Sequence, residues 1–193
     1  MSPVAVLIGP PGAGKSTVGP LLAALLGAEF AETDQMVEEV AGKPVSDIFI
    51  SDGEPAFRNL ERAAVAQALD NHPGIVSLGG GAVLDPQTRQ RLTGHRVVYL
   101  QTGFAAAVRR VGLDTPRPLL LGNPRGRLRE LLAERLPVYE SLAGITVVTD
   151  DRDPQEIADE IAAAITARIA AAAGEGAGTE GDWAGEEAER GSG

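Results

Sequence analysis

The sequence predicts an α/β fold: a parallel sheet with helices on both faces. Three observations support it. Short apolar runs typical of buried strands alternate with longer helix-like stretches. The hydrophobic content is 44% with only 4% aromatic residues, so the core is expected to consist of Val, Leu, Ile and Ala. A glycine-rich segment, residues 9–17, lies between the first strand-like run and the first helix-like run, where α/β proteins place a phosphate-binding loop.

Five short runs are the strand candidates. They cover residues 4–8, 29–33, 75–78, 97–100 and 145–148. Because helix-like stretches separate them, the strands are expected to be parallel and joined by crossover connections.

Seven longer helices and one short helix connect or follow these strands. The longer ones are expected at residues 15–26, 35–41, 55–69, 86–92, 104–111, 125–142 and 154–173, and the short one at 46–49. Gly27 and Gly42 are typical of helix C-termini. Pro55 and Pro154 fit the first turns of their helices, where a backbone N–H has no partner within the helix.

Two stretches fall outside this alternation. Residues 112–126 hold three prolines and three glycines, and a long irregular segment in a compact domain is typical of a mobile lid. Residues 174–193 are rich in Gly, Glu and Ala, a composition that predicts a disordered acidic tail. We therefore expect one domain over residues 1–173, with a lid at about 112–126, followed by this tail.

Composition and charge exclude several classes of protein. The net charge is −10, to which the last twenty residues contribute −5, and such an acidic chain argues against non-specific nucleic-acid binding. The absence of cysteine excludes disulfides and thiol chemistry. No apolar run reaches about 18 residues, and the N-terminus lacks the pattern of a signal peptide. We expect a cytoplasmic monomer that binds small molecules and no membrane.

The segment 9–17 reads Gly-Pro-Pro-Gly-Ala-Gly-Lys-Ser-Thr and matches the pattern G-x-x-x-x-G-K-[ST]. Its successive backbone N–H groups can surround phosphate oxygens, and the following helix adds the positive end of its dipole. Lys15 is expected to reach the β- and γ-phosphates, and the Ser16 hydroxyl to bind Mg²⁺. The nucleotide-binding residues expected here are Gly12, Ala13, Gly14, Lys15, Ser16 and Thr17.

Acidic residues follow the second strand candidate, at the end where α/β proteins bind ligands. Of Glu32 and Asp34, one can lie near Mg²⁺ and the other can accept a hydrogen bond from a substrate hydroxyl. An alternative has equal weight: Thr33 or Asp34 can cap the following helix. The usual Walker-B aspartate is missing after the third strand candidate, so Glu32 is the nearest candidate for the acidic partner of Mg²⁺.

Three glycines, Gly79, Gly80 and Gly81, directly follow the third strand candidate. Glycine lets the backbone approach a ligand closely, and the position at a strand's carboxyl end favours that role. A flexible turn is the simpler alternative.

Three arginines are candidate binding residues. Arg58 can bind a ligand, or it can be a solvated arginine paired with Glu54 or Glu61 on the same helix. Arg117 lies between two prolines in the expected lid, from which it could close over a transferring phosphate. Arg135 ends the basic stretch of the helix expected at 125–142. Surface charge is the alternative for Arg117 and Arg135.

Taken together, these motifs resemble shikimate kinase over roughly residues 4–168, in order and with similar spacing. The phosphate-binding loop alone marks a very large superfamily, whereas the Phe-Arg-x-x-Glu, Gly-Gly-Gly-Ala and Arg-Pro-Leu-Leu pieces are much narrower. The matching pieces are the 9–17 loop, Thr33-Asp34, Asp47-Ile48-Phe49, Gly53-Glu54 with Phe57-Arg58 and Glu61, Leu78-Gly79-Gly80-Gly81-Ala82, Arg117-Pro118-Leu119-Leu120, and Arg135 before Pro137 and Tyr139.

The resemblance implies a three-layer P-loop kinase fold with a five-stranded parallel sheet, helices on both faces and a mobile lid. It also implies an ATP-dependent kinase with Mg²⁺ as cofactor, which phosphorylates the 3-hydroxyl of shikimate in the chorismate pathway to aromatic amino acids. Arg58 and Arg135 would hold the shikimate carboxylate. Asp34 would bind ring hydroxyls and accept the reacting proton, and the Gly79, Gly80 and Gly81 run would line the site.

On the nucleotide side, the resemblance implies that Lys15 and Arg117 meet the phosphoryl group, so that the catalytic residues are Lys15, Asp34 and Arg117. Arg110 and Arg152 would flank the adenine. All of these residue types are present at the matching positions.

One departure from the family concerns the metal. Ser16 would bind Mg²⁺ directly, and the usual aspartate at position 32 is replaced by Glu32, whose contact to the metal would pass through water.

Three other interpretations remain open. Another small-metabolite kinase, such as a gluconate kinase, gives no reason for two carboxylate-binding arginines. A GTP-dependent switch would carry an Asn-Lys-x-Asp motif, which this chain lacks. A non-catalytic nucleotide-binding relative is disfavoured by the intact Lys15, Ser16, Asp34 and Arg117.

Overall fold

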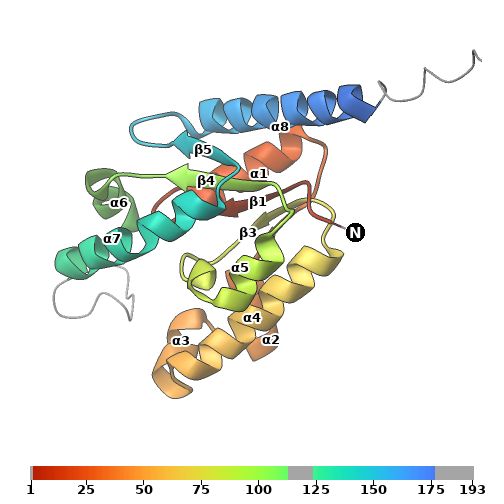
Figure 1. The fold of residues 1–193 in the computed structure, drawn as a ribbon. Coiled ribbons are helices and arrows are strands. Elements are labelled where there is room, and N and C mark those ends of the chain that lie inside the picture. The colour runs from red at the N-terminus through yellow and green to blue at the C-terminus, as the bar shows by residue number, and fades with distance from the viewer. Residues whose placement is uncertain (1, 113–123, 177–193) are drawn as a thin grey trace, which may run out of the picture.

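The structure is a computed structural model that describes residues 2–112 and 124–176. Within these residues, five parallel strands form one sheet in the order β2-β3-β1-β4-β5, with helices on both faces (Figure 1). The strands are β1 (Ala5–Ile8), β2 (Phe30–Glu32), β3 (Ile75–Ser77), β4 (Val97–Gln101) and β5 (Ile145–Val148). The helices are α1 (Lys15–Leu25), α2 (Thr33–Ala41), α3 (Val45–Ser51), α4 (Glu54–Asn71), the 3₁₀ helix η1 (Ala82–Leu84), α5 (Pro86–Leu92), α6 (Phe104–Val111), α7 (Pro124–Leu142) and α8 (Pro154–Gly176).

The predicted three-layer fold is confirmed, and each predicted strand is present with its ends within one residue. The helices differ more at their ends. Helix α2 begins at Thr33, two residues earlier than expected, and η1 was not expected. Helix α7 begins at Pro124, so the last three residues of the predicted lid are helical; the rest of that lid, residues 113–123, lies outside the described residues. Helix α8 continues to Gly176, and residues 177–193 of the predicted tail are not described.

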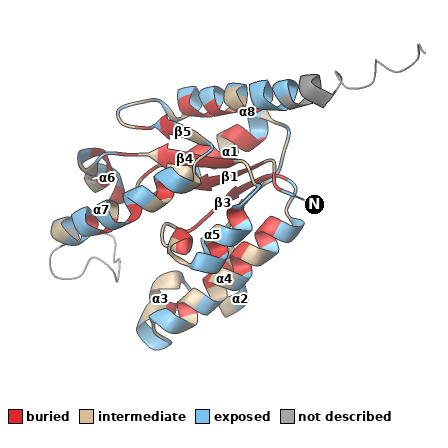
Figure 2. Ribbon diagram, in the orientation of Figure 1, coloured by how far each residue is buried: buried red, intermediate tan, exposed pale blue. Residues whose placement is uncertain are grey.

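The core lies on both faces of the sheet. Strands β1 and β3 are buried along their whole length (Figure 2). The edge strands β2 and β5 are only partly buried. On one face, Val18 and Leu22 of α1 pack with Ile157 and Ile161 of α8 and with the sheet. The opposite face is covered by apolar side chains of α4, α5 and α7. Continuous burial of short apolar runs is what a parallel sheet covered on both sides produces.

Strand direction and connectivity place a crevice at the carboxyl ends of the strands. Because all five strands are parallel, these ends lie on the same side of the sheet, where Glu32 of β2 lies opposite Ser77 of β3. The loop after β1 leads to α1 on one face, and the loop after the neighbouring β3 leads to η1 and α5 on the other. Loops that leave adjacent strands in opposite directions open the position where such sheets bind ligands.

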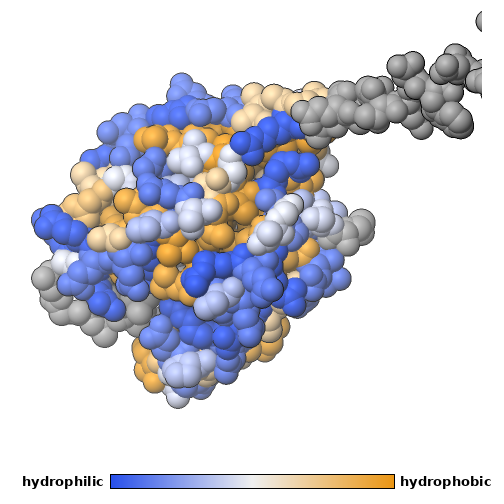
Figure 3. All heavy atoms as spheres, viewed as in Figure 1, coloured by the Kyte–Doolittle hydropathy of each residue, from blue (hydrophilic) through white to orange (hydrophobic). Residues whose placement is uncertain are grey.

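Apolar side chains are directed mostly inward. The face seen in Figure 3 is hydrophilic over α5 and much of α8, and hydrophobic residues are visible mainly between the helices. Over the two described stretches of chain, no helix combines the length and the apolar character needed to cross a membrane.

Candidate active site

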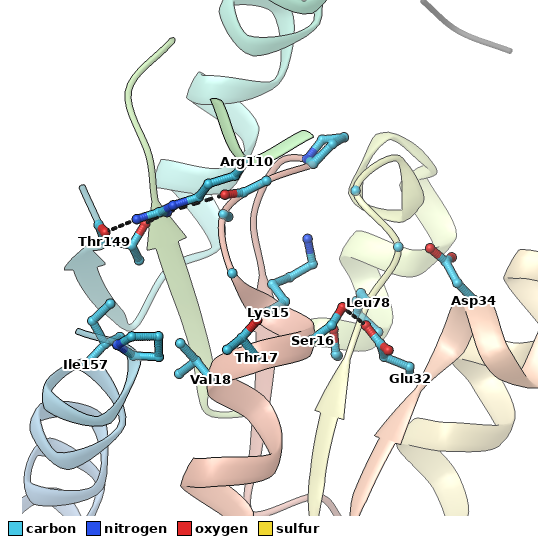
Figure 4. A pocket seen from close by; sticks show the side chains of 18 of the residues that line it. Lys15, Ser16, Thr17, Val18, Glu32, Asp34, Leu78, Arg110, Thr149 and Ile157 are labelled. Carbon is cyan, nitrogen blue, oxygen red and sulfur yellow. Dashed lines mark hydrogen bonds between the residues drawn. The ribbon is translucent and has the colours of Figure 1, made fainter. Parts of the chain in front are cut away.

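A cavity of about 630 Å³ lies at the carboxyl edge of the sheet, where several βα loops meet (Figure 4). Most of the predicted site residues line it: Gly12, Ala13, Gly14, Lys15, Ser16, Thr17, Glu32, Asp34, Gly79, Gly80, Arg110 and Arg152. Gly81, Arg58 and Arg135 do not line this cavity but lie beside the Gly79–Gly80 part of its wall, as the contacts below establish. Arg117 lies outside the described residues.

The phosphate-binding loop connects β1 to α1. Gly12 and Gly14 have φ values of 80° and 94°, a left-handed backbone that glycine adopts without the steric cost of a Cβ atom. Ala13 between them is fully buried, and its N–H donates to the Pro10 carbonyl at 3.2 Å. Helix α1 then begins at Lys15 with no acidic residue in its first turn, so its positive end faces the cavity without a competing carboxylate from that turn.

Lys15 is held across the mouth of its own loop. Its Nζ donates to the carbonyl oxygens of Gly9 at 2.7 Å and Pro10 at 3.2 Å. A phosphate in the cavity would compete for this ammonium group, because charge-assisted hydrogen bonds are stronger than bonds to a neutral carbonyl.

Ser16 and Glu32 meet on the other side of the loop. The Ser16 hydroxyl, in the first turn of α1, donates a hydrogen bond to Oε1 of Glu32 at the end of β2 (Figure 4). A hydroxyl and a carboxylate side by side are oxygen ligands of the kind that Mg²⁺ prefers. No cluster of three or more His, Cys, Asp or Glu side chains suited to a metal occurs in the described part of the chain. These residues therefore fit a Mg²⁺ ion that takes its other ligands from phosphates and water.

Arg110 of α6 joins two parts of the cavity wall. Its Nη1 donates to Thr149 Oγ1 at 2.9 Å and to the Gly12 carbonyl at 3.3 Å, and its Nη2 donates to the Thr149 carbonyl. These bonds connect the phosphate-binding loop to the end of β5 (Figure 4).

Arg152 occupies the loop between β5 and α8. Its Nη1 donates to the Val148 carbonyl at 3.1 Å, and its Nη2 pairs with Glu160 at 2.7 Å. Pro154 and Ile157 line the cavity next to it and add apolar surface. Planar guanidinium groups beside apolar side chains suit the flat face of an aromatic base.

Asp150 caps helix α6 from a distant part of the chain. Gly103 precedes α6 and has no side chain with which to cap it. Asp150 Oδ1 accepts a hydrogen bond from Thr102 Oγ1 at 2.8 Å, and both its oxygens accept from the Gly103 N–H, at 3.0 and 2.9 Å. Asp150 thereby fixes the start of the helix that carries Arg110.

The glycine run after β3 lies against α2 and α4. The Gly79 N–H donates to Thr33 Oγ1 at 3.0 Å, so Thr33 ties α2 to this run. The alternative in which Thr33 or Asp34 caps the helix is therefore not what the structure has: Glu32 precedes α2, and no side chain caps it. A Cβ atom on Gly79 would lie 2.5 Å from Asp34 Oδ1 and 2.8 Å from Glu61 Oε1, so a side chain at this position would displace both carboxylates.

Arg58 is paired with both glutamates of its own helix, and it also contacts the glycine run. Its Nη1 donates to Glu61 Oε2 at 2.6 Å, and its Nη2 donates to Glu54 Oε1 at 3.1 Å. The same guanidinium group lies against Gly81, where a Cβ atom would be 2.6 Å from Nη1. It is thus a paired arginine that also reaches the glycine run.

The two carboxyl groups beside Gly79 are less acidic than usual. Asp34 is exposed on its cavity side, but protein atoms crowd the rest of the group, and this desolvation raises its pKa although the charge of Lys15 works in the opposite direction. Burial likewise raises the pKa of Glu61 despite its bond to Arg58. A carboxylate with a raised pKa is a stronger base than a free one, which suits proton transfer.

Arg135 of α7 approaches the glycine run from the opposite side. It is only 3% exposed, and its Nη1 donates to the Gly80 carbonyl at 2.8 Å. Its Nε is buried and has no hydrogen-bond partner among the described residues. A buried donor without a partner is costly, and such a group often marks the place of a ligand.

Glu61, Tyr139, Thr149 and Asp150 were not among the predicted site residues. Glu61 could have been found, because it lies one turn after Arg58 in the Phe-Arg-x-x-Glu pattern. Tyr139 lies one turn after Arg135 and donates to the same Gly80 carbonyl at 2.6 Å. Thr149 and Asp150 carry no local signal, because their partners are distant in sequence.

Comparisons with known proteins agree on one family. A family profile described as shikimate kinase matches residues 11–166. The chain is 63% identical over 160 residues to the shikimate kinase of Thermobifida fusca (strain YX), covering 83% of this chain and 93% of the relative. It is 57% identical over 167 residues to that of Salinispora arenicola (strain CNS-205), covering 86% and 100%.

A solved structure gives the same result. The shikimate kinase from Acinetobacter baumannii, in complex with shikimate, is 35% identical with a TM-score of 0.82, and the match covers 87% of this chain and 94% of that one. The residues matched by the family profile include most of the phosphate-binding loop and the whole glycine run.

Proposed function

The chain belongs to the shikimate kinase family, and from this premise we propose how its residues share the work of the reaction. It is an ATP-dependent phosphotransferase that transfers the γ-phosphate of ATP to the 3-hydroxyl of shikimate, giving shikimate 3-phosphate in aromatic amino-acid biosynthesis. The observation that carries our assignment of roles is that Lys15 and Asp34, in the first turns of the helices that follow β1 and β2, line one cavity.

The phosphate-binding loop is proposed to hold ATP. The N–H groups around Gly12, Ala13 and Gly14 and at the start of α1 bind the phosphates, and Lys15 leaves its carbonyl partners to neutralise the β- and γ-phosphates. Arg110 and Arg152 flank the adenine. From the sequence alone, Arg117 is assigned the role of neutralising the charge that develops on the phosphoryl group during transfer.

Mg²⁺ is the proposed cofactor. Ser16 would bind it directly and Glu32 through water, and their mutual hydrogen bond supports this pairing. When bound, the ion neutralises negative charge on the β- and γ-phosphates.

The glycine run, α4 and α7 are proposed to hold shikimate. Its carboxylate lies between Arg58 and Arg135, and the unpartnered buried Nε of Arg135 supports that position. The backbone of the run Gly79, Gly80 and Gly81 approaches the substrate closely, since no side chains intervene. Asp34 accepts hydrogen bonds from ring hydroxyls at the boundary between the two substrates.

Asp34 is proposed as the proton acceptor of the reaction. The oxygen of the 3-hydroxyl forms a bond to the γ-phosphorus, while the bond from that phosphorus to the bridging oxygen of ADP breaks. The hydroxyl proton moves to Asp34, whose raised pKa supports this role. Positioning and charge neutralisation supply most of the remaining rate enhancement, as is usual for phosphoryl transfer.

We further propose that the enzyme acts in the cytoplasm and as a monomer. Within one chain the described residues already bring the nucleotide side and the acceptor side of the cavity together. Light scattering on an eluting chromatographic peak measures the mass directly and tests the monomer assignment.

The test of the function is ATP consumption with shikimate, compared with gluconate and with nucleoside monophosphates. We expect ATP to be consumed with shikimate and not with gluconate or nucleoside monophosphates. Lys15→Ala is expected to abolish transfer while the far-ultraviolet circular dichroism stays that of the folded protein.

Arg58→Ala and Arg135→Ala test the acceptor site. Each is expected to weaken shikimate binding by roughly 2–4 kcal/mol and to leave ATP binding nearly unchanged, because a charged contact in a closed site is lost. Arg62→Ala is the matched control, since Arg62 lies one turn after Arg58 on α4 but pairs with Asp85. Equal losses of ATP and shikimate binding would refute the carboxylate role.

A further inference from the structure

The Gly80 carbonyl accepts two hydrogen bonds from one face of helix α7. Arg135 Nη1 donates at 2.8 Å, and the Tyr139 hydroxyl donates at 2.6 Å. Residues four apart on a helix lie on the same face, so both side chains reach the same oxygen. A carbonyl oxygen has two lone pairs, and both are used here.

Burial and ring stacking hold Tyr139 in place for this contact. Its side chain is 1% exposed, and its ring stacks on Tyr99 with centroids 5.1 Å apart and an interplanar angle of 16°. The stack fixes the direction of the hydroxyl, and a buried hydroxyl needs a partner. Burial raises the pKa of Tyr139 well above its usual range, so the group remains a protonated donor at physiological pH.

The two donors to the Gly80 carbonyl are expected to behave differently when substrate binds. Arg135 is the residue proposed to turn to the shikimate carboxylate. Tyr139 has a single O–H donor, which donates to the Gly80 carbonyl. The peptide after Gly80 is planar and trans, so fixing its carbonyl toward α7 also directs the Gly81 N–H away from α7. Because Gly81 lies against Arg58, the orientation of this one peptide affects both sides of the acceptor site.

We propose that Tyr139 is a positioning residue for shikimate: it holds the Gly80 carbonyl, and with it the shape of the glycine run, so that Arg135 is free to bind the carboxylate. This inference rests on the proposed role of Arg135. It adds a residue that touches no substrate and acts on the reaction only through Gly80 and Arg135.

Tyr139→Phe tests the proposal, because it removes the hydroxyl and keeps the stacked ring. We expect shikimate to bind about 3- to 10-fold more weakly, the loss of one neutral hydrogen bond. The Kd for ATP is expected to change by less than about twofold. The melting temperature is expected to stay close to that of a control that loses the other phenol hydroxyl of the stack. Isothermal titration with each ligand measures both constants.

Tyr99→Phe is that control. It removes the other phenol hydroxyl of the same stack, and Tyr99 makes no contact with Gly80 among those found in the described residues. We expect normal shikimate binding in this variant. Hydrogen exchange of residues 79–85 gives a second measurement: the N–H groups of Ala82 and Leu84 bond to the carbonyls of Gly79 and Gly81, and their protection is expected to fall in Tyr139→Phe only.

The chain contains two tyrosines, so the unmutated sequence also provides a test. Protein labelled with 3-fluorotyrosine gives two fluorine signals, which Tyr99→Phe assigns. Addition of shikimate is expected to shift the Tyr139 signal more than that of Tyr99. This arm decides the question if Tyr139→Phe does not fold.

The inference is overturned if the two phenylalanine variants bind shikimate equally, if Tyr139→Phe loses ATP and shikimate binding in parallel, or if shikimate leaves the Tyr139 signal unmoved. Arg135→Ala separates this failure from that of the proposed function. Weak shikimate binding in Arg135→Ala with normal binding in Tyr139→Phe removes only the role of Tyr139. Normal binding in Arg135→Ala removes the carboxylate site on which both depend.

Discussion

At the scale of single residues, Asp34 illustrates how a functional group can oppose stability. Burial raises its pKa although Lys15 works in the other direction, so the folded state binds the proton more tightly than the unfolded state. The ionised carboxylate therefore costs folding free energy at every pH above this raised pKa. The cost shrinks as the pH falls toward the ordinary value of 3.8, below which Asp34 is protonated in both states.

Asp34→Asn is accordingly expected to raise the melting temperature at pH 7 by roughly 1–3 °C while it reduces turnover by about 10²- to 10⁴-fold. Urea unfolding between pH 4 and 8 measures the stabilisation, which is expected to decrease toward the acid end. Asp52→Asn is a control of opposite sign, because the hydrogen bond from Lys43 holds the pKa of Asp52 below its usual range. A destabilised Asp34→Asn variant at neutral pH would contradict this account.

Glu32 is proposed to act through the hydroxyl oxygen of Ser16. Its carboxylate accepts the Ser16 hydroxyl hydrogen bond, which orients that oxygen and puts a negative charge beside the proposed metal position. Glu32→Gln keeps the size and removes the charge, so we expect the Mg²⁺ needed for half-maximal rate to rise roughly tenfold.

Rate against free Mg²⁺ at saturating ATP and shikimate gives this value. Glu32→Asp keeps the charge and is expected to remain active, and ATP binding in the presence of a chelator is expected to be unchanged in both variants. An unaltered Mg²⁺ dependence in Glu32→Gln would leave Glu32 as a structural residue at the end of β2.

At the scale of elements, the start of α6 depends on Asp150 in the loop after β5. We expect Asp150→Ala to cost about 1–2 kcal/mol of stability, because it removes the hydrogen bonds to Thr102 and Gly103 at the start of this helix. ATP affinity is expected to fall with it, since α6 carries Arg110, while shikimate affinity stays nearly constant. Chemical unfolding and titration with each ligand measure these effects.

Asp151→Asn is the matched control for that variant. Its ion pair with Arg109 is largely exposed, and exposed pairs contribute little to stability. Asparagine also tolerates the left-handed backbone at this position, where φ is 53°. A loss in Asp151→Asn as large as that in Asp150→Ala would show that the helix cap is not the cause.

The elements and the site differ in how far local sequence predicts them. The strands were predictable because each is a short run between turn or helix signals in a sheet covered on both faces. The start of α2 was not, because Thr33 suits both a cap and a first-turn position, and its hydroxyl instead bonds Gly79, 46 residues away. Motif residues such as Lys15 were found from their spacing. Tyr139 was not, because only the assembled fold brings it to Gly80.

At the scale of the whole molecule, the described domain ends in a helix and the remaining segment is acidic. The sequence predicts that residues 177–193, in which Trp183 is the single large apolar side chain, add nothing to the core. Removing them is expected to leave the melting temperature within about 1 °C and the turnover number unchanged. Thermal scans and steady-state assays of the shortened chain check this, and a clear loss of either property would point to Trp183.

The strand order has a consequence for the order in which the protein is made. The phosphate-binding loop follows β1, which is synthesised before the other described strands, yet β1 lies at the centre of the sheet, between β3 and β4. Its helix, α1, is covered by Ile157, Ile161 and Ile165 of α8, which is synthesised last among the described elements. A nascent chain therefore carries the nucleotide-binding motif long before it has the packing that gives the motif its shape. We therefore expect nucleotide to bind only when translation of the domain is nearly complete, so that an unfinished chain does not sequester ATP.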